Sequence, residues 1–159
     1  MERVTKILNH PTFRGCLAQI GELEKDRIYC SHDLTHFLDV ARIAAILNAE
    51  ECHAVPKELI YGTALLHDIG RHRQYLHQEP HHEASAKIAK EILKDCDFTK
   101  EEQMRVLDAI LAHRNPKQKV DALSDIIYRA DKLSRLCCCC DVEASCNWSR
   151  EKKNLTIRY

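Results

Sequence analysis

The chain has 159 residues, the length of one ordinary domain, and a chain of this size buries enough apolar surface to fold without disulfides. Its 24 basic and 24 acidic residues balance, which argues against a disordered polyanion, a basic nucleic-acid coat and a polybasic membrane anchor. No apolar run approaches the ~18 residues that a membrane span requires. The charged first residues do not resemble a secretory signal, so we expect a cytoplasmic protein.

Apolar residues recur every three or four positions in segments that are expected to be helices: 12–25, 34–49, 56 to about 70, 83–94, 99–113 and 123–136. Pro56 suits a first helical turn, and Thr99 with Glu102 forms a capping box. Gly70 is expected to end the third helix in a left-handed conformation, and Asn115-Pro116 is expected to end the fifth. The polar segment 71–80 is expected to be a loop.

Glycine and proline number only four each, and no long run alternates with the period of a strand, so the predicted class is all-α. We expect one compact bundle of about six helices at residues 1–136. An irregular Cys-rich tail at 137–159 is expected to pack on the same domain.

Several histidines and aspartates fall on helix faces that should be buried, namely His36, His67, Asp68, His113 and Asp131. A buried carboxylate without a partner costs several kcal/mol, so it must be protonated, paired or bound to a cation. Imidazole nitrogen and carboxylate oxygen are ligands that divalent metals accept. The pattern therefore predicts a metal site between helices. His10, His72 and His77 lack this periodicity and are expected at the surface or at the mouth of the site.

Three stretches of the sequence carry a family resemblance: DLTHFLDVA at 33–41, ALLHDIGR at 64–71 and YRADK at 128–132. They resemble the HD domain, a helical superfamily of metal-dependent phosphohydrolases. The likeness covers residues 28–136, which would form the core of an HD-type helical bundle. The resemblance implies that a metal ion is bound by His36, His67, Asp68 and Asp131.

Members of this family with two metal ions have two further histidines. Here His113 matches one position and either His81 or His82 matches the other, with the local spacing favouring His81. Such a set resembles the HD-type symmetrical diadenosine-tetraphosphate hydrolases, with Asp68 bridging the ions. The HD-GYP phosphodiesterases have a second histidine where this chain has Arg114, so a cyclic-dinucleotide role is disfavoured. The expected cofactor is one or two divalent ions of iron, manganese, cobalt, nickel or zinc.

The resemblance implies a metal-dependent phosphohydrolase that cleaves a nucleotide or another small phosphate ester with a metal-activated water. Asp68 is a catalytic candidate because it can orient that water. Arg71, Arg114 and Lys132 are candidates because cations stabilise the charge that spreads over phosphoryl oxygens. A nucleotide-sensing module with a structural metal and a di-iron HD-type oxygenase remain as alternatives. The expected partner is a small phosphate compound rather than nucleic acid or a membrane, and a homo-oligomer is left open.

Five of the nine cysteines lie close together near the C-terminus. Cys137 and Cys140 have the Cys-x-x-Cys spacing, and Cys146 follows. Three interpretations remain: packed structural thiols, an additional zinc or iron–sulfur site, and redox-linked control. A metal site would need a fourth ligand that the tail does not offer, so Cys16 or Cys30 would have to supply it.

Overall fold

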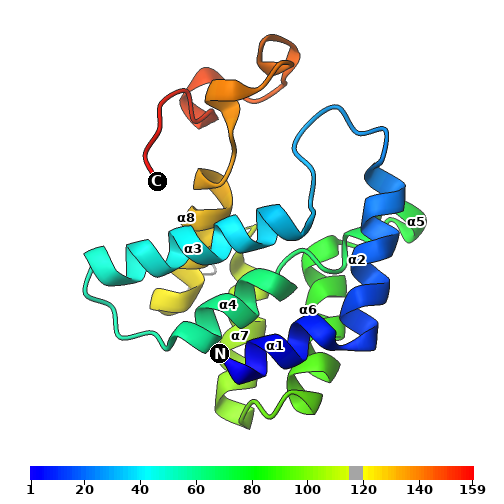
Figure 1. Ribbon diagram of the computed structural model, residues 1–159, viewed down its shortest axis with the longest axis vertical. Coiled ribbons are helices and arrows are strands. Elements are labelled where there is room, and N and C mark those ends of the chain that lie inside the picture. Colours follow the sequence, from blue (N-terminus) through cyan, green and yellow to red (C-terminus); the bar gives the residue numbers. More distant parts are fainter. Residues whose placement is uncertain (115–119) are drawn as a thin grey trace.

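A computed structural model describes residues 1–114 and 120–159, and the described chain is helical with no strand (Figure 1). The expected all-α class is confirmed. The expected helix end at Asn115-Pro116 lies outside the described residues. No described helix has the length and apolar character that crossing a membrane requires. The α-helices are α1 (Glu2–Asn9), α2 (Pro11–Glu24), α3 (Leu34–Glu50), α4 (Lys57–Leu66), α5 (Arg71–His77), α6 (His81–Asp95), α7 (Lys100–Ala112) and α8 (Ala122–Leu133).

The core forms where α3 packs on α4 and α8, while α7 packs between α6 and α8. Phe37 of α3, Leu65 of α4 and Ile110 of α7 are fully buried there, because each lies on the apolar stripe of its helix. Side chains cap several helix starts: among them, Asp33 caps α3, and Thr99 forms the expected capping box of α7 with Glu102. This packing brings the start of α3 and the end of α4 to one end of the bundle.

Two short helices were not expected from the sequence. In α1 only Val4 and Ile7 are buried, too few positions to reveal a helical period. The segment expected to be a loop contains α5, so that prediction was wrong. His72, expected near the surface, is buried in α5, with its Nδ1 3.1 Å from the Ile69 carbonyl oxygen. Packing against α2 and α6 thus outweighs the polar composition of this segment.

The expected left-handed conformation of Gly70 was also wrong: its φ is −87° and its ψ is 4°. The glycine is required by close packing, because a Cβ atom built there would lie 2.4 Å from the backbone nitrogen of Ser85 in α6. The Gly70 amide also donates to Ser85 Oγ over 2.9 Å. This contact fixes the start of α6 beside the turn that follows α4.

The chain after α8 forms only single 3₁₀ turns, η2 (Cys137–Cys139), η3 (Glu143–Ser145) and η4 (Arg150–Lys152). In Figure 1 this tail, coloured orange to red, extends from the same end of the bundle as the loop between α2 and α3. The Tyr29 hydroxyl of that loop donates to the Ser145 carbonyl oxygen over 3.2 Å.

Candidate metal centre

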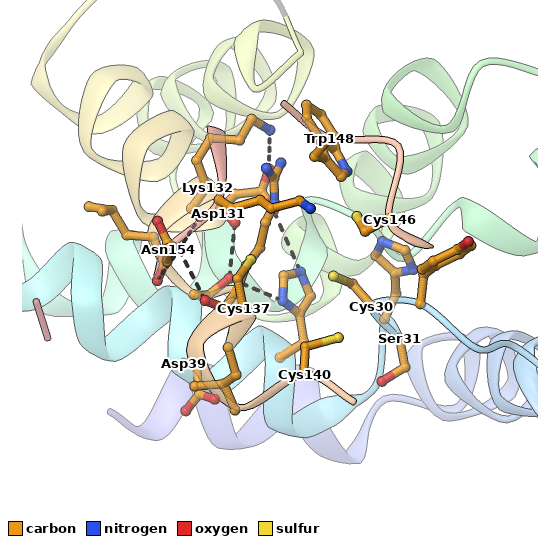
Figure 2. A pocket seen from close by; sticks show the side chains of 18 of the residues that line it. Cys30, Ser31, Asp39, Asp131, Lys132, Cys137, Cys140, Cys146, Trp148 and Asn154 are labelled. Carbon is orange, nitrogen blue, oxygen red and sulfur yellow. Dashed lines mark hydrogen bonds and ion pairs between the residues drawn. The ribbon is translucent and has the colours of Figure 1, made fainter. Parts of the chain in front are cut away.

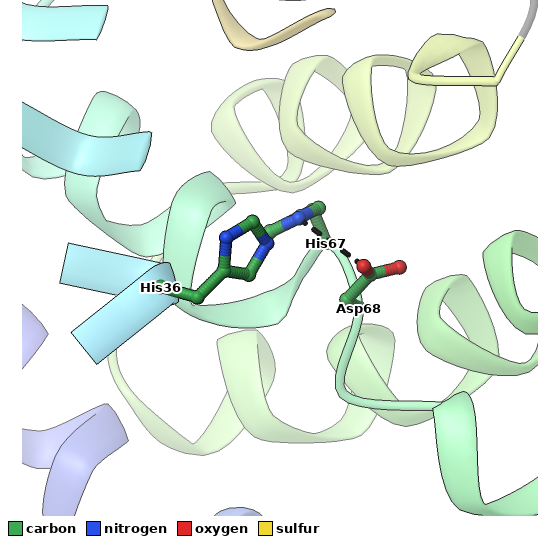
Figure 3. A group of neighbouring side chains, drawn as sticks. All are labelled: His36, His67 and Asp68. Atoms are coloured by element: carbon green, nitrogen blue, oxygen red, sulfur yellow. Dashed lines mark ion pairs between the residues drawn. The ribbon is translucent and has the colours of Figure 1, made fainter. Parts of the chain in front are cut away.

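Asp68 lies at the centre of a group of imidazoles and is only 1% exposed. Its Oδ1 atom is 3.2 Å from Nε2 of His81 and 3.4 Å from Nε2 of His113. Its Oδ2 atom is 3.5 Å from Nε2 of His67. Figure 3 shows that carboxylate beside the His67 ring, with the His36 ring on the other side of His67. The two oxygens of one carboxylate therefore face two different sets of histidines.

Each set has the composition of a metal site. The first consists of His36, His67 and Asp68, and the second of Asp68, His81 and His113, with the ligand atoms of each set within 4.8 Å of one another. Asp131 adds a carboxylate to the first set, since its Oδ1 is 3.7 Å from Nε2 of His36. These residues could hold two divalent ions that share Asp68.

The other ring nitrogen of each histidine is engaged away from Asp68. A hydrogen bond from Nδ1 fixes the tautomer and leaves the Nε2 lone pair for a metal, as in most protein metal sites. The Nδ1 partners are the Ala64 carbonyl for His67 (2.7 Å), the Ile110 carbonyl for His113, the Gln74 side-chain oxygen for His81 and the Ser134 hydroxyl for His36 (3.3 Å).

Some polar atoms at the centre have no hydrogen-bond partner among the described residues. They are Nε2 of His36, Nε2 of His67 and Oδ1 of Asp68, all buried. Leaving such atoms unpaired away from water costs free energy. A cation in each ligand set would together satisfy these atoms, so the residues present fit metal ions with nitrogen and oxygen ligands.

Burial and neighbouring charges also set the protonation states of these side chains. Desolvation lowers the pKa of His67 to about 4 and that of His81 to about 2. Desolvation alone would raise the pKa of Asp68, but Arg71 and the imidazoles of His67 and His113 hold that pKa well below its ordinary value. At neutral pH the centre therefore combines the neutral imidazoles of His67 and His81 with the ionised carboxylate of Asp68, which is the form that binds metal.

These shifts predict acid sensitivity of the metal-free protein. His67 takes up its proton near pH 4 in the folded chain but near its ordinary 6.5 when unfolded, so the unfolded state binds more protons between these values. Stability should therefore fall as the pH drops from 6.5 toward 4, by about 1.4 kcal/mol per pH unit for each such histidine. Urea unfolding in chelator at pH 7, 6 and 5 measures the effect. Equal unfolding midpoints at pH 7 and 5 would contradict the burial of neutral imidazoles.

The predicted cationic residues line the approach to the centre. Nη2 of Arg71 donates to Oδ2 of Asp68 over 3.0 Å. Lys132 forms an ion pair with Asp131, and both line a cavity of about 970 Å³ together with Arg71 and Arg114. Arg71, Arg114 and Lys132 thus line the same cavity, and their contact with an anion stays a prediction.

Of the two adjacent histidines, the structure brings His81 into the group and leaves His82 outside it. The His82 ring is 6.4 Å from the His113 ring, centroid to centroid. Helix α6 begins at His81, two residues before the expected start, and this register decides which imidazole faces Asp68.

A buried carboxylate that contacts a histidine next to Asp68 was not predicted from the sequence. Glu24, buried at the end of α2, has Oε1 2.6 Å from Nδ1 of His32 and also accepts from the Tyr75 hydroxyl. The other ring nitrogen of His32 is 3.6 Å from Oδ2 of Asp68. Glu24 continues the apolar stripe of Phe13 and Ile20, a signal that could have identified a buried acid.

Comparisons with known proteins agree with this geometry. The HD domain family profile matches residues 33–136. The chain is 46% identical to an uncharacterised protein of Clostridium beijerinckii over the full length of both chains. It aligns with the crystal structure of a predicted HD superfamily hydrolase from an uncultured Thermotogales bacterium over 95% of this chain and 87% of that one, with a TM-score of 0.64 and 25% identity.

A further likeness is to a longer protein. The chain is 31% identical to ribonuclease Y of Campylobacter concisus over 115 residues, which make up 72% of this chain and 20% of that protein. The chain therefore spans about a fifth of the length of ribonuclease Y. The family profile, the solved structure and the buried His/Asp group lead to the same assignment, and the chain belongs to the HD domain family.

Proposed function

We propose that the protein is a metal-dependent phosphohydrolase that acts on a nucleotide or another small phosphate ester. The observation that carries the proposal is the single buried carboxylate of Asp68, whose two oxygens face separate pairs of imidazoles. Metal ions held there would supply a water of lowered pKa and positive charge beside the phosphoryl oxygens.

The side chains of the cavity suit a phosphorylated ligand. Arg71 holds Asp68 in place through one guanidinium nitrogen, while its Nε is buried without a hydrogen-bond partner in the described chain. The arginine can therefore orient the carboxylate and still offer a donor to an anion. The remaining cations of the cavity wall are Arg27, Arg114, Lys132, Arg135, Lys152, Lys153 and Arg158.

The same cavity has aromatic groups at a distance from the charged centre. Tyr29 and Trp148 line its wall, and Trp148 is 41% exposed. The Arg135 guanidinium lies 4.1 Å from the centre of the indole ring and holds it in place. An aromatic face next to cations suits a base and its phosphates, which favours a nucleotide over a simple phosphate ester.

Metal content and hydrolysis together test this proposal. At the His/Asp centre, wild-type protein purified without chelator should hold two metal equivalents, His113→Ala about one, and His82→Ala two, because His82 lies outside both ligand sets. The metal-loaded wild type should hydrolyse a dinucleoside polyphosphate or a nucleotide in a panel that also contains p-nitrophenyl phosphate and a short RNA.

Three results would contradict the proposal. The first is a wild-type protein that binds no metal, and the second is an equal loss of metal in His113→Ala and His82→Ala. The third is a metal-loaded protein that hydrolyses nothing in the panel but consumes oxygen with a polyol or a phosphonate, as the oxygenase alternative requires.

A further inference from the structure

The C-terminal tail has a defined course without a hydrophobic anchor of its own. Among the described residues from 136 to 159 none is buried, and no turn is longer than three residues. Polar contacts hold its ends: the Asn154 side-chain amide donates to the carbonyl oxygens of Lys132 and Leu133 over 2.8 and 3.1 Å. Such bonds contribute little net free energy each, so a segment of this kind usually needs a covalent or metal cross-link.

Cysteines of two distant segments line one cavity. Cys30 comes from the loop between α2 and α3, and Cys137, Cys139, Cys140 and Cys146 come from the tail. Of these tail cysteines Cys139 is exposed, whereas the other three are partly buried. Figure 2 shows Cys30, Cys137, Cys140 and Cys146 around the same space below Trp148. The sequence alone could not identify Cys30 as the fourth cysteine, because the fold brings two distant segments together.

Local geometry and charge support the grouping. Cys137 begins the 3₁₀ turn η2 and Cys140 directly follows it, and residues three apart in such a turn point to the same side. Desolvation and the thiols of Cys137 and Cys140 raise the pKa of Cys30, while Arg135 lowers it. The Lys153 ammonium pairs with the Glu143 carboxylate over 2.7 Å and also lies near Cys137 and Cys146. Cys30 therefore lies near Cys137 and Cys140, and the positive charge of Arg135 favours its thiolate.

We propose that Cys30, Cys137, Cys140 and Cys146 form a second metal site with four thiolate ligands, separate from the His/Asp centre. Thiolates select zinc or iron–sulfur clusters, whereas the imidazoles and carboxylates of the first centre suit a harder cation. Occupation of this site would fasten the tail to the loop at 25–33. The proposal of this thiolate site does not depend on hydrolysis of a phosphate ester.

The spread of the sulfurs bears on the identity of the metal. Within the described chain, cysteine sulfurs form no group of three within 4.8 Å of one another. A single zinc ion, with Zn–S bonds of about 2.3 Å, draws its ligands closer than that, whereas an iron–sulfur cluster spans a wider set. We therefore expect a cluster, and acid-labile sulfide distinguishes it from zinc.

The experiment compares cysteine variants purified under anaerobic conditions. Iron, acid-labile sulfide, zinc and visible absorption are measured per chain in the wild type, Cys30→Ser, Cys146→Ser and Cys138→Ser. Cys138 is the matched control, because it belongs to the same run of cysteines but is exposed and does not line the cavity. The wild type and Cys138→Ser should carry acid-labile sulfide with its iron. Cys30→Ser and Cys146→Ser should lose most of the sulfide and of that iron, and should keep the metal of the His/Asp centre. Far-UV circular dichroism verifies that the variants fold.

His113→Ala separates the two centres, since it should lose metal from the His/Asp centre and keep the sulfide or zinc of the thiolate site. Zinc without sulfide, lost in Cys30→Ser and kept in Cys138→Ser, would support the site and assign zinc to it. The proposal is overturned if the wild type holds neither sulfide nor thiol-dependent zinc. It is also overturned if Cys30→Ser and Cys138→Ser behave alike, or if Cys30 is found in a disulfide.

Discussion

Replacing Asp68 by asparagine should remove metal from both ligand sets and lower hydrolysis by roughly 10³-fold or more. The substitution keeps the volume of the side chain but removes the charge that both sets share. Four imidazoles with neutral rings and one amide would offer a cation no buried negative charge except that of Asp131, which already pairs with Lys132. Helical content should be preserved, because the core residues around the site are unchanged.

Metal analysis, circular dichroism and a phosphate-release assay on the same preparation measure these effects. Asp39→Asn is the matched control: Asp39 lines the same cavity but pairs with Arg42 over 3.0 Å and belongs to neither ligand set. It should keep its metal and most of its activity. Retention of both metal equivalents by Asp68→Asn would refute the shared-carboxylate arrangement.

Much of the centre could be predicted from helical periodicity. His36, His67 and His113 each lie in line with apolar residues of their own helices, and the same line carries the rings of His67 and His113 into the core, while His36 is partly buried. Periodicity reports only the face of one helix, however. It could not choose between His81 and His82, because that choice depends on where α6 begins.

Helical periodicity could not predict features that depend on contacts between segments distant in the sequence. The burial of His72 in α5 and the role of Glu24 beside His32 arise from the packing of α2 on α5. The placement of Cys30 beside the tail depends on the path of a loop, for which no repeat or period exists in the sequence. In each case the residue type indicated a possible chemical role, but the residues that it contacts could be identified only from the folded structure.

Gly70→Ala should destabilise the protein by about 2–3 kcal/mol, because the added methyl group meets backbone atoms that cannot rotate away. Its Cβ would lie 2.4 Å from the Ser85 nitrogen and 2.7 Å from the Ala84 carbonyl carbon. Relief requires α6 to move away from the turn after α4. That movement would also carry His81 away from Asp68, so metal in the second ligand set should be lost first.

Gly21→Ala provides the comparison for the same chemical change. Gly21 lies in α2, and an added Cβ there meets nothing within 4 Å. Alanine at that position should stabilise the protein by about 0.5–1 kcal/mol, since glycine is the poorer helix former. Urea unfolding of both variants and metal titration of Gly70→Ala test the expectation. If the two variants unfold at the same urea concentration, close packing at Gly70 does not hold α6 against the turn, and the position of His81 must have another cause.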